Sequence, residues 1–366
     1  MNTITNIKHI EFGNNSIDKL ELTLLKILDI NELTSENFIL IFMDIFFKSN
    51  EDLIIKLKSI NCQVEIYFVD SSKEPSTNGI DDYKRIINQS FDINPSAIIG
   101  IGGGVVLDTS KAVSNILNNP GKSSEYQGWD LLQNSGIPKI GIPTVSGTGA
   151  ESSRTCVLTN KETGLKLGMN SDFTIFDALI LDPHLTSTVP KEVFFFTLFD
   201  AFFHSFEPLS GRNRNLFGDA YASIGLNLSK EILLSHDLMS EKNRSNAMLA
   251  SYFGGLSVAN GMTTLVHPIS AALGVVFSIP HTYANCLALS GLEEFFPEEY
   301  KFLFNALERH NIKLTSVTHE IDNNILDNLY NSTIVHEKPL SNYFGESFKE
   351  IFNKSKGFEV FKSILT

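Results

Sequence analysis

A carboxylate and an imidazole occur in the most apolar segment of this 366-residue chain. In "FFFTLFDAFFHSFE", residues 194–207, phenylalanines surround Thr197, Asp200, His204 and Glu207. These four residues follow one another at steps of three, four and three, which places them on one face of an α-helix. Because an unpartnered buried carboxylate is costly, this face must meet a cation, a hydrogen-bond network or a metal ion.

Two further histidines, His267 and His281, lie in a second apolar segment, "TTLVHPISAALGVVFSIPHTYANC". With Asp200 and His204 they form a set of nitrogen and oxygen donors that suits Zn²⁺ or Fe²⁺. Taken singly, a buried histidine is more often a hydrogen-bonded core residue than a metal ligand. We interpret the other histidines as surface or helix-capping residues: His9, His184, His236, His310, His319 and His336.

The segments that must position these residues change in character along the chain. In the first half, short apolar runs alternate with helical patterns, at residues 38–43, 63–68, 97–101, 138–142 and 178–182. Such alternation predicts a mostly parallel sheet covered by helices on both faces. From about residue 190 on, helical patterns follow one another without a convincing strand. The sequence therefore predicts an α/β domain over residues 1–187 and an all-α domain over residues 188–366.

A glycine-rich turn follows the third apolar run. In "AIIGIGGGVVLDTSKAV" the strand leads into Gly102, Gly103 and Gly104 and then directly into a helix, an arrangement that can bind a pyrophosphate. The glycines are contiguous, so this is not the G-x-G-x-x-G fingerprint, and Lys111 lies too far along for a Walker A loop. Asp108 and Lys111 share a helix face. The alternative is a tight turn followed by a surface ion pair.

A second loop and an acidic residue add to this pattern. "GIPTVSGTGAESS" places Thr144 and Thr148 among glycines after another strand, which suits a phosphate, ribose or nicotinamide amide, although a polar surface loop has the same composition. Asp44 ends the run "FILIFMD". An acid there can bind an adenosine ribose and repel a 2'-phosphate, which favours NAD over NADP, or it can be a helix N-cap.

Composition limits the partners and the compartment. The formal charge of -13 argues against nucleic acid, whose binding needs clustered Lys and Arg. The cysteines Cys62, Cys156 and Cys286 are odd in number and widely spaced, which indicates neither a disulfide framework nor a cysteine zinc site. Neither a secretory signal nor a plain membrane span is evident. We therefore expect a cytoplasmic protein that acts on a small molecule.

Taken together, the motifs resemble those of the iron-containing (group III) alcohol dehydrogenase family. They are "GGGVVLDTSK", "PTVSGTGAE", "DPHLTSTVP", "DAFFH", "VHPIS" and "IPHTYAN", in the family order across residues 38–290. The resemblance implies a dehydroquinate synthase-like fold, with an α/β dinucleotide-binding domain, a helical metal-binding domain, the active site between them, and a homodimer. It implies metal ligation by Asp200, His204, His267 and His281. It also implies that the nucleotide lies near Asp44, Gly102, Gly103, Gly104, Asp108, Thr144, Thr148 and Lys166.

Within that family, "GTGAESSRTCVLTN" and "LGMNSDFTIFDALILDP" are most similar to the 3-deoxy-D-manno-octulosonate (Kdo) 8-oxidase branch. That branch oxidises the terminal hydroxyl of Kdo in the biosynthesis of 8-amino-Kdo lipopolysaccharide. An acidic sugar needs a cation, for which Arg154, Arg212 and Arg214 are candidates, although the last two can instead be solvated loop charges. Two positions depart from the family pattern, since Ala271 replaces a histidine and Thr282 a glycine.

The expected chemistry is hydride transfer. A divalent metal, Fe²⁺ or Zn²⁺, lowers the pKa of a bound alcohol, and NAD accepts the hydride. Three alternatives stay open: a general alcohol, aldehyde or polyol dehydrogenase, a dehydroquinate synthase-like cyclase, and a catalytically silent homologue. The cyclase needs a cluster of Lys and Arg for a phosphate, and Arg212 and Arg214 are the only candidates for it in the sequence.

Overall fold

The computed structural model describes residues 6–316 and 322–365, and the chain divides into two compact units. The α/β unit comprises Met1–Val145 and Ala150–Thr188, and the helical unit comprises Ser146–Gly149 and Val189–Thr366. The loop Ser146–Gly149 therefore groups with helices that follow it by at least forty residues. A single cut of the chain does not describe this division.

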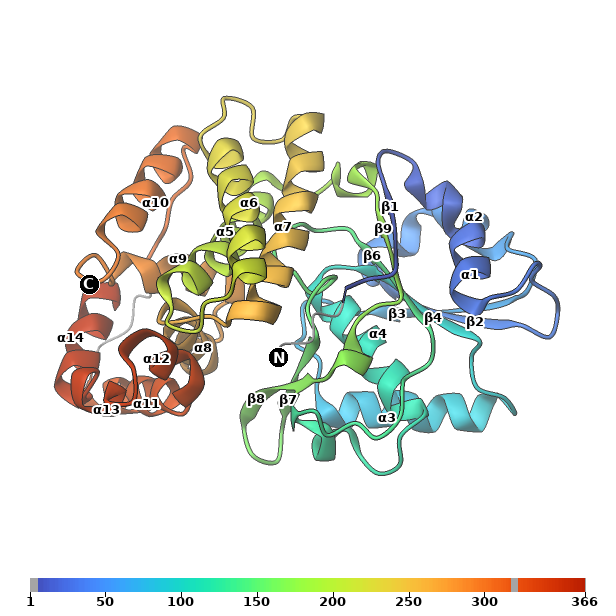
Figure 1. Ribbon diagram of the computed structural model, residues 1–366, viewed down its shortest axis with the longest axis horizontal. Coiled ribbons are helices and arrows are strands. Elements are labelled where there is room, and N and C mark those ends of the chain that lie inside the picture. The colour runs from blue at the N-terminus through green and yellow to red at the C-terminus, as the bar shows by residue number, and fades with distance from the viewer. Residues whose placement is uncertain (1–5, 317–321, 366) are drawn as a thin grey trace. The chain divides into compact units, whose positions relative to one another are not determined.

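The α/β unit is built on a six-stranded parallel sheet with the strand order β1-β9-β6-β4-β2-β3 (Figure 1). Five of these strands are those expected from the apolar runs, and β1 was not predicted. The strands are β1 (His9–Phe12), β2 (Phe38–Asp44), β3 (Gln63–Val69), β4 (Ala97–Gly102), β6 (Lys139–Pro143) and β9 (Ala178–Leu181). The helices of this unit are α1 (Leu20–Leu28), α2 (Glu51–Lys58), α3 (Thr77–Ser90) and α4 (Gly104–Leu117).

Helices cover both faces of this sheet, because its central strands are apolar on both sides. Along β2, Ile39 and Ile41 belong to one hydrophobic core together with residues of α1 and α2. Phe38 and Leu40 belong to another core with residues of α3 and α4. A smaller sheet, ordered β5-β8-β7, adds β5 (Gly128–Trp129), β7 (Thr155–Asn160) and β8 (Leu165–Asn170).

The helical unit has one large hydrophobic core, in which every residue of 194–208 on α5 is buried. Helix α5 packs against α6, α7 and α9 (Figure 1). The unit contains α5 (Lys191–Ser210), α6 (Leu216–Leu233), α7 (Glu241–Gly261), α8 (Val266–Phe277), α9 (His281–Ser290), α10 (Pro297–His310), α11 (Asn323–Ile334), α12 (Glu337–Phe344), α13 (Phe348–Ile351) and α14 (Lys354–Leu365). The predicted combination of an α/β domain with an all-α domain is thus confirmed.

Among the helices of the described segments, none by itself is long and apolar enough to span a membrane, and α7 with α8 passes only as a pair bent by 105°.

Candidate functional site

Four polar side chains gather in the apolar core of the helical unit. Asp200 and His204 lie one turn apart on α5, and both are buried. His267 is the second residue of α8, and His281 is the first residue of α9, directly after Pro280. Three helices, α5, α8 and α9, therefore contribute side chains to one cluster.

The distances in this cluster are those of groups that can share one ion. Oδ1 of Asp200 lies 3.7 Å from Nε2 of His204, 3.6 Å from Nε2 of His267 and 3.8 Å from Nε2 of His281. Donor atoms of Asp200, His267 and His281 all lie within 4.8 Å of one another, and Nε2 of His204 is 3.1 Å from Nε2 of His267. Ligands at about 2.1 Å from a tetrahedral Zn²⁺ are about 3.4 Å apart, so the spacing fits.

The hydrogen bonding of the cluster also fits a metal. Oδ2 of Asp200 is buried and makes no hydrogen bond to any described residue. A buried carboxylate oxygen without a partner carries a large desolvation penalty, which a bound cation would remove. The exposed fraction of the His281 side chain is 35%, against 0% for Asp200, so the cluster is reached from solvent on its His281 side.

Burial and the neighbouring charged groups together set the pKa values of Asp200, His204 and His267. Burial alone would raise the pKa of Asp200, but the neighbouring histidines His204, His267 and His281 outweigh it and lower that pKa. Burial lowers the pKa of His204, and the Asp200 carboxylate only partly opposes it. For His267 burial is outweighed by the carboxylates of Glu207 and Asp200, which raise its pKa to about 10. The ionised carboxylate of Asp200 therefore lies beside a His267 ring that the two carboxylates hold in its protonated form.

Two further residues complete the cluster, and no role was predicted for either of them. Asn285, one turn after His281, donates a hydrogen bond of 2.8 Å to Oδ1 of Asp200. Glu207, fully buried on α5, contacts Nδ1 of His267 through Oε2. Glu207 was already placed on the polar face of α5 by its spacing from Asp200 and His204. Asn285 could have been found in the same way, because it follows His281 by four residues and so shares a face of α9 with it.

The residues expected near a nucleotide lie largely at one edge of the parallel sheet. Met43 on β2 pairs with Ile101 on β4, and Gly102 pairs with Pro143 on β6. The carboxyl ends of these strands therefore bring Asp44, the glycine turn and Thr144 to the same edge, and the Thr144 N–H donates to the Gly102 carbonyl at 3.1 Å. Strand order reverses between β2 and β4, the point at which open α/β sheets bind ligands.

The glycine turn has the geometry of an anion site. Helix α4 begins at Gly104, and no side chain caps its N-terminus at Gly103. A Cβ atom at Gly102 would lie 2.5 Å from Cγ2 of Val106, so glycine there permits the close approach of α4 to β4. At Asp44 the N-cap alternative is observed, because its Oδ1 accepts a hydrogen bond of 3.0 Å from the Phe46 N–H. Nucleotide contacts of these residues stay predictions.

Asp108 and Lys111 do not form the surface ion pair considered from the sequence. Lys111 is fully buried, and its ammonium donates to the carbonyls of Ala150, Ser153 (2.9 Å) and Thr155 (3.0 Å). Asp108 accepts a 3.0 Å hydrogen bond from the Val157 N–H, and burial raises its pKa to about 6. Both side chains thus fasten the segment leading into β7 to α4, because buried charges need partners.

The remaining expected nucleotide residues occupy different surroundings. Lys166 on β8 forms a 3.0 Å ion pair with Glu74. Thr148 lies in the loop Ser146–Gly149, which packs in the helical unit. In that loop a Cβ atom at Gly147 would overlap the Thr197 carbonyl of α5, and the Gly149 N–H donates to the Ser251 hydroxyl at 3.2 Å. The two glycines of this loop therefore also serve close helix packing.

Each candidate arginine already has partners in the protein. Arg154 pairs with Asp130 at 2.5 Å and with Asp172 at 2.9 Å. Arg212 donates to the carbonyls of Tyr343 (3.1 Å) and Phe344 (3.2 Å). These hydrogen bonds join the loop between α5 and α6 to the end of α12. Arg214 pairs with Asp219 at 2.6 Å. A role for any of them toward a substrate carboxylate stays a prediction.

Two observations concern the other histidines. His310 was interpreted as a surface or capping residue, and this was wrong, because its side chain is buried and its Nε2 lies 2.8 Å from the Leu233 carbonyl. The side chain of His310 faces the core because the last turn of α10 packs against Phe195 of α5. His319 lies outside the described residues. His336 is half-buried and close enough to His267 for that ring to lower its pKa, after the larger effect of burial.

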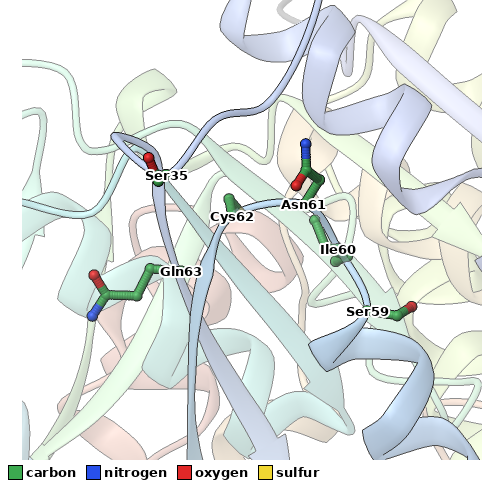
Figure 2. Close-up of a pocket in the computed structure, with 6 residues that line it drawn as sticks. All are labelled: Ser35, Ser59, Ile60, Asn61, Cys62 and Gln63. Atoms are coloured by element: carbon green, nitrogen blue, oxygen red, sulfur yellow. The ribbon is translucent and has the colours of Figure 1, made fainter.

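A depression of about 470 Å³ in the α/β unit lies at the opposite edge of the sheet from the glycine turn. Its lining runs from the end of α2 to Gln63, the first residue of β3, and includes Cys62. Figure 2 shows that the side chains of Ser59, Asn61 and Gln63 point in different directions. This depression is therefore separate from the predicted nucleotide edge.

Comparison with known proteins identifies the family of this chain. Family models match residues 8–183 (iron-containing alcohol dehydrogenase) and residues 194–331 (Fe-containing alcohol dehydrogenase family, C-terminal). The chain is 34% identical over 224 residues to the sulfoacetaldehyde reductase of Bilophila wadsworthia, a match that covers 59% of this chain and 56% of that protein. It is 33% identical over 222 residues to the probable alcohol dehydrogenase EutG of Escherichia coli, covering 59% and 55%.

The extent of the matches and the fold can be compared as well. The chain spans little more than half the length of the two curated relatives. A solved structure of sulfoacetaldehyde reductase from Bifidobacterium kashiwanohense in complex with NAD⁺ has a TM-score of 0.83 at 19% identity, covers 100% of this chain and 99% of that one, and so shares the fold. With both family models matched in order along the sequence, this chain belongs to the iron-containing alcohol dehydrogenase family.

Proposed function

We propose that this chain is a dehydrogenase that depends on a divalent metal and NAD and interconverts an alcohol with its carbonyl product. The observation that carries the proposal is the convergence of Asp200, His204, His267 and His281, with one Asp200 oxygen buried and unpartnered. Family membership makes redox chemistry at this cluster the best-supported reading.

The residues of the chain would divide the work as follows. Asp200 and the three histidines would hold the metal ion, which when bound acts as a Lewis acid toward the alcohol oxygen. The open N-terminus of α4 would bind the pyrophosphate of the dinucleotide, and Asp44 the adenosine ribose. The phenylalanines of α5 exclude water around the cluster, which strengthens the electrostatic interactions inside it.

The identity of the alcohol substrate is a second proposal. On the sequence resemblance, we propose the terminal (C8) hydroxyl of Kdo, oxidised to an aldehyde for 8-amino-Kdo lipopolysaccharide. Relatives that act on other compounds make a small aldehyde or alcohol the competing substrate, as the names sulfoacetaldehyde reductase and NAD-dependent methanol dehydrogenase indicate. A Kdo carboxylate would have to engage Arg154, Arg212 or Arg214 in competition with the partners they have now.

One experiment tests metal, cofactor and substrate together. Purified protein is analysed for bound Fe and Zn and is assayed with NAD and Kdo, 1,3-propanediol and ethanol, and with NADH and sulfoacetaldehyde. Turnover of Kdo but of none of the small substrates supports Kdo as the substrate. Turnover of the small substrates but not of Kdo refutes it. Bound metal without redox turnover of any substrate would refute the dehydrogenase and favour a cyclase.

A pair of variants tests the ligand assignment. His267→Ala removes a ligand from the cluster and is expected to abolish metal binding, whereas His236→Ala removes an exposed histidine and is expected to have no effect. Full metal occupancy of active His267→Ala protein would contradict the assignment.

Assembly and location complete the proposal. We propose a homodimer, which the family resemblance implies, and sedimentation of the purified protein tests it. A cytoplasmic location is proposed because all three cysteines are free thiols, as expected in a reducing compartment.

A further inference from the structure

Glu207 lies on the same face of α5 as Asp200 and His204, and it is not among the four expected metal ligands. Its side chain is fully buried, one turn beyond His204. A buried carboxylate persists only where hydrogen-bond donors satisfy it. The donors that surround Glu207 come from residues 264–267, which lead into α8 and form its first residues.

One oxygen of Glu207 caps the N-terminus of α8. Oε1 accepts hydrogen bonds from the N–H of Thr264 at 3.0 Å and of Val266 at 2.9 Å, and from the Thr264 hydroxyl at 3.2 Å. Helix α8 begins at Val266, and its own N-cap residue, Leu265, provides no side-chain cap. A carboxylate from α5 therefore satisfies N–H groups that α8 itself leaves without a cap, at the end where the helix dipole favours negative charge.

The other oxygen contacts the imidazole of His267. Oε2 is hydrogen-bonded to Nδ1 of His267. Since an ionised carboxylate only accepts hydrogen bonds, we assign the shared hydrogen to Nδ1. In the neutral ring, Nε2 then carries the lone pair, and Nε2 is the atom that lies 3.6 Å from Oδ1 of Asp200.

We propose that Glu207 is a positioning residue that sets the tautomer and the orientation of His267 as a metal ligand. This inference rests on the proposed metal-dependent function. Through its two oxygens Glu207 ties the ligand on α8 to the helix that carries Asp200 and His204. Carboxylates that orient ligating histidines in this way raise metal affinity by about 10- to 100-fold.

Glu207→Gln separates the two roles of the carboxylate. The carbonyl oxygen of glutamine can still accept from Thr264 and Val266, so the cap of α8 is kept. The amide nitrogen then faces Nδ1 of His267 and can only donate, which favours the tautomer with hydrogen on Nε2. That hydrogen occupies the position at which the metal would bind.

The experiment uses full-length protein stripped of metal and titrated with Co²⁺. Affinity is measured by competition with a chelator, the ligand field by the visible Co²⁺ absorption, and folding by the melting temperature of the metal-free protein. Glu192→Gln is the matched control, because Glu192 lies exposed in the first turn of the same helix. Glu207→Ala removes the cap as well as the contact to His267.

We expect Glu207→Gln to bind Co²⁺ about 10- to 100-fold more weakly, with an altered absorption band and a metal-free melting temperature close to that of the wild type. Glu207→Ala is expected to lower that temperature as well. Equal Co²⁺ affinity and spectrum in wild type and Glu207→Gln would overturn the inference alone. So would a melting temperature reduced as far in Glu207→Gln as in Glu207→Ala. Wild-type protein that binds no divalent metal would overturn the proposed function and this inference together.

Discussion

The side-chain amide of Asn285 donates a hydrogen bond of 2.8 Å to Oδ1 of Asp200, and both side chains are fully buried. The same amide nitrogen lies 3.5 Å from Nε2 of His281, one turn earlier on α9. One helical turn therefore carries both an expected metal ligand and the group that orients a second one. Second-sphere contacts of this kind fix the direction in which a ligand presents its lone pairs.

Asn285→Ala is expected to weaken metal binding by about 10- to 100-fold, because Asp200 loses the group that orients it. It also leaves a buried oxygen with fewer donors, which should lower the free energy of unfolding by about 1–3 kcal/mol. Chelator competition and urea unfolding measure the two effects. Ser290→Ala, on the same helix, is the control, since the Ser290 hydroxyl bonds only the Leu287 carbonyl of its own helix in the described structure. Unchanged metal affinity would contradict a positioning role.

Asp44→Asn tests the predicted preference for NAD. The asparagine oxygen can still accept from the Phe46 N–H, so the cap after β2 is kept and the melting temperature should change little. Removing the negative charge ends the repulsion of a 2'-phosphate. The ratio of kcat/KM for NAD to that for NADP is expected to fall by about tenfold or more, a change of about 1.4 kcal/mol or more in transition-state discrimination. The same ratio in Asp52→Asn, an exposed acid on α2, should stay at the wild-type value.

The glycine turn offers two neighbouring substitutions with different outcomes. Gly102→Ala places a Cβ atom 2.5 Å from Val106, whereas the nearest atom to a Cβ atom at Gly103 is 3.6 Å away. Overpacking should cost Gly102→Ala about 1–3 kcal/mol of unfolding free energy. Gly103→Ala should be close to neutral, because its φ of -80° is open to any residue.

Thermal or urea unfolding of both glycine variants measures this difference. Adding Val106→Ala to Gly102→Ala removes the atoms that clash, so the two substitutions together should cost less than their sum. Equal losses in Gly102→Ala and Gly103→Ala would show that the close approach of α4 to β4 is not the constraint.

Asp108 should leave a signature in the pH dependence of stability. Burial raises its pKa to about 6 in the folded protein, above the ordinary value of 3.8. The folded state thus holds this proton more tightly than the unfolded state. The stabilisation from the protonated form is complete below about pH 4 and is lost as the pH rises through about 6.

Asp108→Asn keeps a neutral side chain and an acceptor for the Val157 N–H at every pH. The difference in unfolding free energy between variant and wild type should therefore grow in favour of the variant as the pH rises from about 4 to about 6. Urea unfolding at several pH values measures it. A difference that stays constant over this range would contradict the raised pKa.

Local patterns were sufficient for much of the fold. Strands β2, β4, β6 and β9 could be predicted because they lie inside the sheet and are buried along their whole length, which favours mostly apolar runs. The edge strand β3 could be predicted because apolar residues 66–69 follow its exposed Gln63 and Glu65. Strands β1, β7 and β8 could not, because polar residues interrupt each of them; β1 and β8 alternate half-buried with exposed residues, and β7 alternates half-buried with buried ones over its first four positions. For such strands the pairing partner decides whether the segment is extended.

The roles of single charged residues were harder to predict from the sequence than the helices and strands. Lys111 and Asp108 have the helical spacing of a surface pair, yet both reach separate backbone groups of residues far along the chain. Arg212 likewise meets carbonyls from α12, more than a hundred residues later. Helical spacing shows which residues share a face, but it does not show what covers that face.

By itself, the sequence determined the fold class, the family, and the set of buried donors on the inward face of α5. These depend on local periodicity and short motifs, which are written in neighbouring residues. The resemblance implied that His267 and His281 join Asp200, but only the tertiary structure gave the contacts among them and those of Glu207 with His267 and of Asn285 with Asp200. These contacts join α5 to helices that begin about sixty to eighty residues away, and chain packing, rather than spacing in the sequence, brings such groups to within 4 Å.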